Sequence, residues 1–100
     1  MDFLNTYNQQ IVELCKSYNV KSLSVFGSVL TNRFSSKSDI DFIVDFQEQD
    51  PLKYADNYFD LKFHLQDLLN RHIDLLESKS LKNPYLSEQI QSNKVAIYGN

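Results

Sequence analysis

The stretch FGSVLTNRFSSKSDIDFIVDF, residues 26–46, ends in a run in which apolar and acidic residues alternate. Successive side chains of a strand point to opposite faces, so this run predicts a strand with two unlike faces. One face is entirely apolar and belongs to a core: Ile40, Phe42, Val44 and Phe46. The other face carries Asp39, Asp41, Ile43 and Asp45. Because a buried carboxylate is costly to desolvate, this second face is expected to open onto solvent or a ligand where the strand begins.

Two carboxylates at this spacing can hold a hard cation. Mg²⁺ commonly takes one or two carboxylates and fills its other positions with water and substrate phosphates. A carboxylate pair can also bridge two ions during a phosphoryl-type transfer. An isolated Asp-x-Asp is equally typical of a solvated strand end, so Asp39 and Asp41 need support from the rest of the chain.

Gly27-Ser28 provides that support. A glycine at a strand end lets a phosphate approach the backbone closely, and a Gly-Ser turn that enters a helix offers free amide donors to an anion. An ordinary strand-ending glycine with a serine N-cap is the alternative. A phosphate cradle followed by a carboxylate pair on the next strand predicts a site for a nucleoside triphosphate with its metal ion.

Asp74 is the third acidic candidate, because its neighbours Ile73 and Leu75 should point to the core. If its strand lies beside the strand that follows Asp39, Asp74 joins the acidic face. It would then be a metal ligand or a general base towards an incoming hydroxyl. A solvent-facing aspartate is the alternative.

Apolar spacing and turn residues predict the other elements. They are helices at 3–18, ending near Asn19, at 52–69 and at 84–90, strands at 23–28, 40–46 and 72–77, a short helix or turn at 29–34, and a last strand or packing tail at 94–98. The connection between the first two strands, about a dozen residues, is short for a parallel crossover. We therefore expect an α/β (α+β) fold with a small mixed sheet, an antiparallel first pair and flanking helices.

The bulk properties narrow the class of protein. One hundred residues fit a single domain over 1–100, and the net charge of −3 argues against nucleic acid, which needs a basic face. Cys15 is the only cysteine and follows the apolar stripe of the first helix, so it predicts a core position and no internal disulfide. Without a signal peptide or a membrane-length apolar run, we expect a cytoplasmic protein with no membrane contact.

Gly27-Ser28, followed by residues 38–41 (Ser-Asp-Ile-Asp) and the apolar run 42–44, resembles the signature of the minimal nucleotidyltransferases of the DNA polymerase β superfamily. Residues 73–75, Ile-Asp-Leu, resemble the strand that carries the third carboxylate in that family. Residues 83–99 resemble its closing segment. The resemblance covers nearly the whole chain and implies the nucleotidyltransferase fold.

The resemblance also implies an activity and partners. The activity is Mg²⁺-dependent transfer of a nucleoside monophosphate from an NTP, with AMP from ATP as the expected case. The implied catalytic and metal-binding residues are Asp39, Asp41 and Asp74; the implied nucleotide-binding residues are Gly27, Ser28, Arg33 and Ser38. Many such proteins are antitoxins of HEPN-domain ribonuclease toxins, and some transfer AMP to a toxin tyrosine. We therefore expect ATP or another NTP and a cognate HEPN toxin as partners, and leave homo- or hetero-oligomers open.

One position departs from the family. Its members commonly carry Arg-Gly three residues after the serine, where this chain has Thr31 and Asn32. Asparagine tolerates the left-handed conformation that the turn requires. Arg33 is displaced by two positions, roughly 200° on a helix, and does not simply replace the family's arginine. Nucleotide affinity, rather than metal binding, is what the departure puts in question.

Other chemically active residues have plainer interpretations. His64 and His72 are expected on the surface or in packing, because no His/Cys cluster accompanies them. His72 shares the face of Asp74, which leaves an accessory contact to substrate open. Asp45 lies too far along its strand to reach the same ion as Asp41, and the stripe of Tyr54, Tyr58 and Leu61 predicts core packing.

Three functions fit these observations. The carboxylate triad favours a transferase that modifies a protein hydroxyl. The Thr31-Asn32 departure and the small size favour an antitoxin that acts by occlusion alone, with weak or no catalysis. A polynucleotide-directed transferase is disfavoured by the negative charge.

Overall fold

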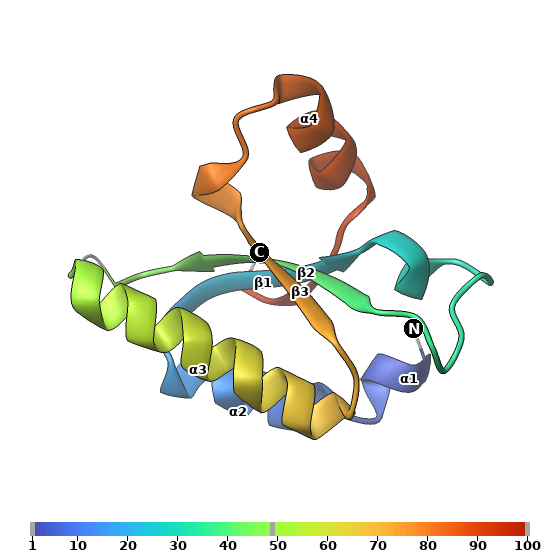
Figure 1. Ribbon diagram of the computed structural model, residues 1–100, viewed down its shortest axis with the longest axis horizontal. Coiled ribbons are helices and arrows are strands. Elements are labelled where there is room, and N and C mark those ends of the chain that lie inside the picture. The colour runs from blue at the N-terminus through green and yellow to red at the C-terminus, as the bar shows by residue number, and fades with distance from the viewer. Residues whose placement is uncertain (1, 49, 100) are drawn as a thin grey trace.

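The computed structural model describes residues 2–48 and 50–99, which form a four-stranded sheet with helices on both faces (Figure 1). In chain order the elements are α1 Asp2–Asn5, α2 Asn8–Ser17, β1 Val20–Phe26, the 3₁₀ helix η1 Gly27–Leu30, β2 Ile40–Phe46, α3 Pro51–Leu69, β3 Ile73–Glu77, the 3₁₀ helix η2 Ser78–Ser80, α4 Pro84–Asn93 and β4 Val95–Tyr98. The sheet order is β3-β2-β1-β4. β1 pairs antiparallel with β2 and with β4, whereas β2 pairs parallel with β3. The predicted mixed sheet with an antiparallel first pair is confirmed.

The two faces of the sheet are covered differently. α2 and α3 lie against one face, and α4 stands over the other (Figure 1). The main core lies between the sheet and the helices α2 and α3, and it includes the apolar face of β2, as predicted. Its fully buried side chains include Ile11, Cys15, Leu23, Val25, Ile40, Phe42, Leu61, Leu65 and Ile73. Burial raises the pKa of the Cys15 thiol to about 12, which keeps it in the neutral form expected of a core residue.

The first predicted helix is wrong in one respect, because it is broken into α1 and α2. The chain turns at residues 6–7, where the Tyr7 N–H donates to Leu4 O at 3.0 Å. Thr6 lies in this turn and Asn5 and Asn8 flank it; all three are weak helix formers, so the packing of the apolar stripe decides the local backbone. Phe3, Leu4 and Tyr7 still reach the core, which explains why their helical spacing persists across the break.

Local signals fix the ends of the longer helices. Asp50 caps α3, because its Oδ1 accepts from the N–H groups of Leu52 and Lys53, and Pro51 occupies the first turn. Asn83 and Pro84 do the same for α4, which runs to Asn93, three residues beyond the predicted end. β1 begins at Val20, three residues before the predicted start at Leu23, directly after Asn19 turns the chain at φ 56°. Among the described helices, none has the length and apolar content needed to cross a bilayer.

Candidate active site

Asp41 and Asp74 face each other across two neighbouring strands. The parallel register of β2 and β3 pairs Ile40 with Ile73 and Asp41 with Asp74. The isoleucines point into the core, so the two aspartates share the opposite face. The condition on which the interpretation of Asp74 depended, that its strand lies beside β2, is therefore met.

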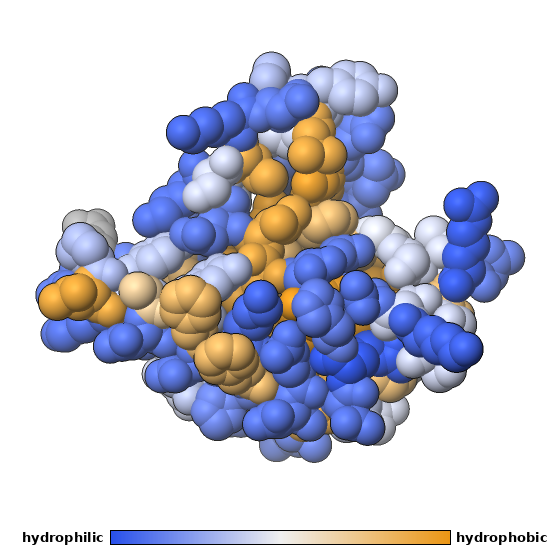
Figure 2. Space-filling view, viewed as in Figure 1, coloured by the Kyte–Doolittle hydropathy of each residue, from blue (hydrophilic) through white to orange (hydrophobic). Residues whose placement is uncertain are grey.

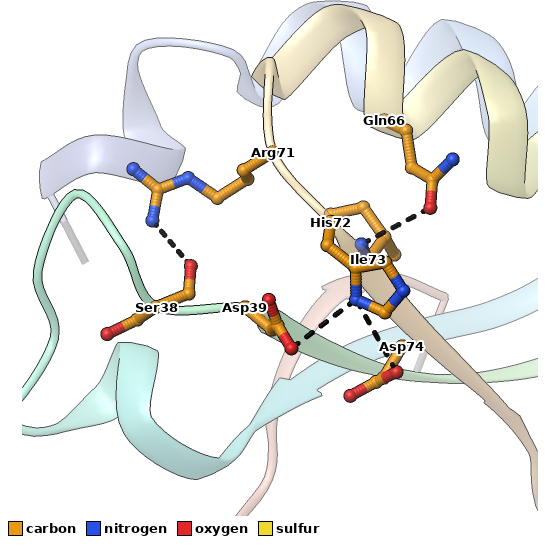
Figure 3. A network of polar contacts seen from close by, with 7 residues as sticks. All are labelled: Ser38, Asp39, Gln66, Arg71, His72, Ile73 and Asp74. Atoms are coloured by element: carbon orange, nitrogen blue, oxygen red, sulfur yellow. Dashed lines mark hydrogen bonds and ion pairs between the residues drawn. The ribbon is translucent and has the colours of Figure 1, made fainter.

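Asp39 and His72 lie just before these two strands and complete the acidic edge. His72 Nδ1 is 3.4 Å from Asp39 Oδ2 and 3.8 Å from Asp74 Oδ1 (Figure 3). One potential ligand atom from each of these three residues lies within 4.8 Å of the others, which is close enough to share a metal ion. All three side chains are about half exposed, so a ligand can reach them from solvent.

His72 lies on the surface, as expected, and on the face of Asp74, as its two-residue spacing from Asp74 indicated. The sequence did not predict that it joins Asp39 and Asp74 as a potential metal ligand. His64, by contrast, stacks on Tyr18 with ring centroids 5.6 Å apart, which agrees with the packing role expected of it.

The carboxylates are crowded enough to perturb one another. Partial burial, a hydrogen bond with Asp74 and the charges of Asp74 and Asp39 together raise the pKa of Asp41 to about 6. Each of these causes disfavours the ionised form. A cation bound at this edge would remove the repulsion, so the electrostatics favour metal binding.

Gly27 connects the first strand to the acidic edge through close packing. Its φ is +79°, which side-chain-bearing residues rarely adopt, and a Cβ built on it would lie 2.5 Å from Asp41 Oδ2. Only a glycine therefore allows the start of η1 to lie against the Asp41 carboxylate. Ser28, the next residue, is half-buried at the start of η1. The structure therefore places Gly27 of the Gly-Ser turn against Asp41 of the acidic pair.

The departing positions shape the connection after η1. Thr31 ends η1 with extended backbone, and its hydroxyl donates to Ser28 O at 2.9 Å. The same hydroxyl accepts from the backbone N–H of Arg33 at 3.2 Å, and Arg33 itself is exposed. Within residues 2–48 and 50–99, the non-glycine residues with left-handed backbone are Asn19 and Asn70, so Asn32 does not adopt the conformation that asparagine tolerates.

Arg71 is a residue that sequence reasoning missed. Its Nη1 donates to Ser35 O at 3.0 Å and to Ser38 O at 2.9 Å, so it clasps the connection directly before Asp39 (Figure 3). The guanidinium also lies between two aromatic rings, 4.5 Å from the centroid of Phe3 and 4.6 Å from that of Phe34. No local pattern predicts this clamp, because Arg71 and its partners lie in three separate segments of the chain.

Ser38 contributes to the same loop. Its carbonyl accepts from Arg71, and its hydroxyl accepts from the Ser35 N–H at 3.0 Å. Both groups therefore hold the connection that precedes Asp39. Asp45 lies further along β2, opposite Ser22 of β1 and away from the pairing of Asp41 with Asp74, which agrees with its exclusion from the site.

A family model and curated relatives agree on the family to which this sequence is similar. The profile described as "Polymerase beta, Nucleotidyltransferase" matches residues 9–100. A provisionally named protein adenylyltransferase of Methanocaldococcus jannaschii, MJ0128, is 39% identical over 85 residues, which cover 84% of this chain and 83% of that protein. The protein adenylyltransferase MntA of Thermococcus cleftensis is 34% identical over 71 residues, covering 71% of this chain and 69% of its own.

Solved structures show the same fold. A provisionally assigned minimal nucleotidyltransferase superimposes with a TM-score of 0.74 at 28% identity, over 94% of this chain and 92% of that one. A toxin–antitoxin crystal structure with AMP-PNP gives 0.72 at 21% identity, over 93% and 73% of the two chains. A complex of a tri-AMPylated Shewanella oneidensis HEPN toxin with its MNT antitoxin gives 0.65 at 20% identity, over 96% and 72%. With its mixed sheet, its acidic edge and these relatives, the chain belongs to the polymerase β nucleotidyltransferase family.

Proposed function

We propose that this nucleotidyltransferase is a cytoplasmic antitoxin that transfers AMP from ATP to a hydroxyl of a cognate HEPN-domain toxin and releases pyrophosphate. A tyrosine is the expected acceptor. The observation that carries the proposal is the convergence of three aspartates beside Gly27. At Gly27 the backbone lies so close to the Asp41 carboxylate that a side chain would collide with it. A protein that only binds its partner has no need of these groups together.

The donor set suits a divalent cation. Carboxylate oxygens such as those of Asp39, Asp41 and Asp74 are the ligands that Mg²⁺ prefers. Burial raises the pKa of Asp41 first, and the neighbouring Asp74 and Asp39 add a repulsion that a cation would relieve. When bound, Mg²⁺ would polarise the transferred phosphoryl group and offset its developing charge. His72 stands within reach of the same position and would be displaced or would add a nitrogen ligand.

The remaining steps fall to the chain's own groups. Asp74 is about half exposed at the edge strand β3, so an incoming hydroxyl can approach it and lose its proton to the carboxylate. The backbone amides at Gly27 and Ser28, where η1 begins beside Asp41, would donate to oxygens of the triphosphate. We assign Arg33 and Ser38 to the outer part of the nucleotide site, from the family pattern rather than from a contact.

The partner is proposed from the relatives. Curated relatives carry the name protein adenylyltransferase, and the structural neighbours include toxin–antitoxin complexes, one with AMP-PNP and one with an AMPylated HEPN toxin. These are properties of those proteins, and they support the same arrangement here: ATP as donor and a HEPN toxin as acceptor.

A binding-only antitoxin is the second candidate. The observation that favours it is the connection after η1, where Thr31 replaces the family's usual arginine and Arg71 is engaged by loop carbonyls and aromatic rings. Neither residue extends a free cation towards the triphosphate position. Weak ATP affinity would leave occlusion of the toxin as the main activity.

One experiment separates the two candidates. The protein is incubated with Mg²⁺, ATP labelled at the α-phosphate and the HEPN protein encoded beside it, in parallel with the Asp39→Ala/Asp41→Ala variant. Label on the toxin that disappears in the variant, together with loss of neutralisation, supports catalysis. Neutralisation that persists in the variant while the toxin stays unlabelled would establish occlusion instead. Asp45→Ala, on the same strand face but outside the acidic edge, is the matched control.

A further inference from the structure

A cavity of about 780 Å³ opens between η1 and α4. Phe26, Gly27 and Leu30 line one side of it, and α4 supplies Leu86 and Ile90 on the other. Figure 2 shows hydrophobic side chains gathered under α4, where this helix meets the rest of the molecule. The cavity is within the usual range of small-molecule sites, which measure about 300–1,000 Å³.

The cavity adjoins the acidic edge. Gly27 belongs to its lining, and the same residue lies against the Asp41 carboxylate. Phe26 is the cross-strand partner of Asp41 on β1. The cavity therefore begins where the proposed triphosphate site ends, and a single molecule can occupy both.

The position of the cavity relative to Asp74 indicates which of the two substrates the cavity would bind. On the sheet face that carries the acids, Asp41 has Phe26 on one side and Asp74 on the other. The acceptor hydroxyl must approach Asp74, at the β3 side. The cavity lies on the opposite side, next to the Gly-Ser turn, so it is placed for the nucleotide and not for the acceptor.

The lining has the chemistry of a nucleoside site. Apolar side chains dominate it, which suits the faces of a heteroaromatic base, and two amide side chains, Gln89 and Asn93, add polar groups. The Asn93 amide nitrogen donates to Gln89 O at 2.9 Å, which leaves its Oδ1 as an acceptor. Thr31, at the position where the family usually has arginine, also lines the cavity.

We propose that this cavity binds the base and ribose of the nucleoside triphosphate, so that α4 contributes to nucleotide affinity through its pocket-lining face. The inference rests on the proposed function, because it assumes that a triphosphate binds beside Gly27. It adds a substrate contact on an element that carries none of the motif residues.

The test compares two ligands that share a triphosphate. Binding of ATP and of methyl triphosphate, which has the phosphates without the nucleoside, is measured by calorimetry with Mg²⁺. We expect ATP to bind at least about tenfold more tightly, the equivalent of roughly 1.4 kcal/mol. Equal affinities would overturn the inference and leave the proposed function intact. Absence of binding for both ligands would overturn the proposed function and this inference with it.

A matched pair of variants locates the effect on α4. Gln89 and Gln91 are both exposed residues of this helix, but only Gln89 lines the cavity, and their side chains are about 200° apart around the axis. Gln89→Trp should fill the cavity and weaken ATP binding about tenfold while the affinity for methyl triphosphate stays unchanged. Gln91→Trp should change neither affinity. Equal effects of the two variants, or a loss of methyl triphosphate binding in Gln89→Trp, would contradict the assignment.

Discussion

Asp41 and Phe42 are neighbours on β2, yet their side chains lie in opposite environments. Phe42 is fully buried beneath α2 and α3, in a core of apolar residues from these helices and from the sheet. Asp41 is half-buried on the other face, between Phe26 and Asp74, with its pKa raised by burial and by neighbouring acids. One strand therefore supplies a large part of the core and also carries a set of charges that repel one another.

The difference shows how a small chain accommodates a costly site. The apolar face is closed by two helices, so its contribution to stability does not depend on the acidic face. On the acidic face, Ile43 of β2 and Ile90 of α4 are buried, while the side chains of the acidic edge stay about half exposed. Substitutions on the two faces should therefore have separable effects on stability and on activity.

The largest expected effect belongs to the core face. Phe42→Ala should lower the free energy of unfolding by about 3–5 kcal/mol, because it removes a fully buried aromatic side chain and leaves a cavity. Urea denaturation followed by circular dichroism measures the loss. Phe59→Ala, a phenylalanine of α3 that is 53% exposed, is the control and should cost less than about 1 kcal/mol. Similar losses for the two variants would contradict the placement of the core.

Gly27 tests the contact between the two halves of the site. Gly27→Ala should reduce transferase activity about 100-fold and the free energy of unfolding by about 1–3 kcal/mol, since the new Cβ strains φ and meets the Asp41 carboxylate. In the Asp41→Ala background, the same substitution should destabilise less, because the collision with Oδ2 is gone. A double-mutant cycle measures this difference, and strictly additive free energies would argue against the contact.

Arg71 tests whether the loop before Asp39 is held in place for metal binding. Arg71→Lys keeps the charge but loses the double hydrogen bond and the stacking on two rings, so the Mg²⁺ concentration for half-maximal activity should rise about tenfold. Titration of the activity with Mg²⁺ measures the change. Lys37→Met removes an exposed cation from the same loop and should leave the Mg²⁺ requirement unaltered. A lower melting temperature with an unchanged Mg²⁺ requirement would reduce Arg71 to a purely structural role.

The smallest expected effect concerns the charge of Asp41 in the metal-free protein. Its pKa is raised from 3.8 to about 6 in the folded state, so folding favours the protonated form. The stability that this proton confers is present below about pH 4 and is lost as the pH rises through about 6. Asp41→Asn removes that loss and should raise the free energy of unfolding at neutral pH by about 1 kcal/mol, a figure reduced because solvent screens a half-exposed group.

Urea unfolding at about pH 5 and about pH 7.5, with chelator present, measures this dependence. The gain from Asp41→Asn should be larger at the higher pH. Gln47→Ala, at an exposed position beside β2 and without a titratable group, is the control and should show no dependence on pH over this interval. A gain for Asp41→Asn that is equal at the two values would show that the acidic edge does not strain the fold.

Much of this arrangement could be predicted from local patterns. The bounds of β2 follow from the apolar residues at every second position, and the antiparallel direction of the first strand pair follows from the short connection between the two strands. The pairing of Asp41 with Asp74 could be stated only as a condition, because register between strands that are distant in sequence depends on packing rather than on local spacing. The three aspartates of the acidic edge could be named from the sequence, whereas their positions relative to one another required the structure.

Other features leave no trace in a local pattern. The clamp joins Arg71, two residues after the end of α3, to α1 and to the loop before β2, so no single window of sequence contains it. The family profile begins at residue 9, which places Phe3 of this clamp outside the matched segment. The break between α1 and α2 has a similar origin, since the same apolar spacing fits one helix or two. In each case tertiary packing decides between alternatives that the sequence allows equally.

The pairing of β4 with β1 has a consequence for the order of folding. Ser24 pairs with Ala96, so this part of the sheet closes a loop that contains most of the chain, whereas β2 and β3 are joined by a single helix. Long loops are slow to close, and contacts of high sequence separation form late. During refolding, the acidic edge should recover its affinity for Mg²⁺ before α4 and β4 dock. The nucleotide would then find its phosphate site formed earlier than the wall that holds its base.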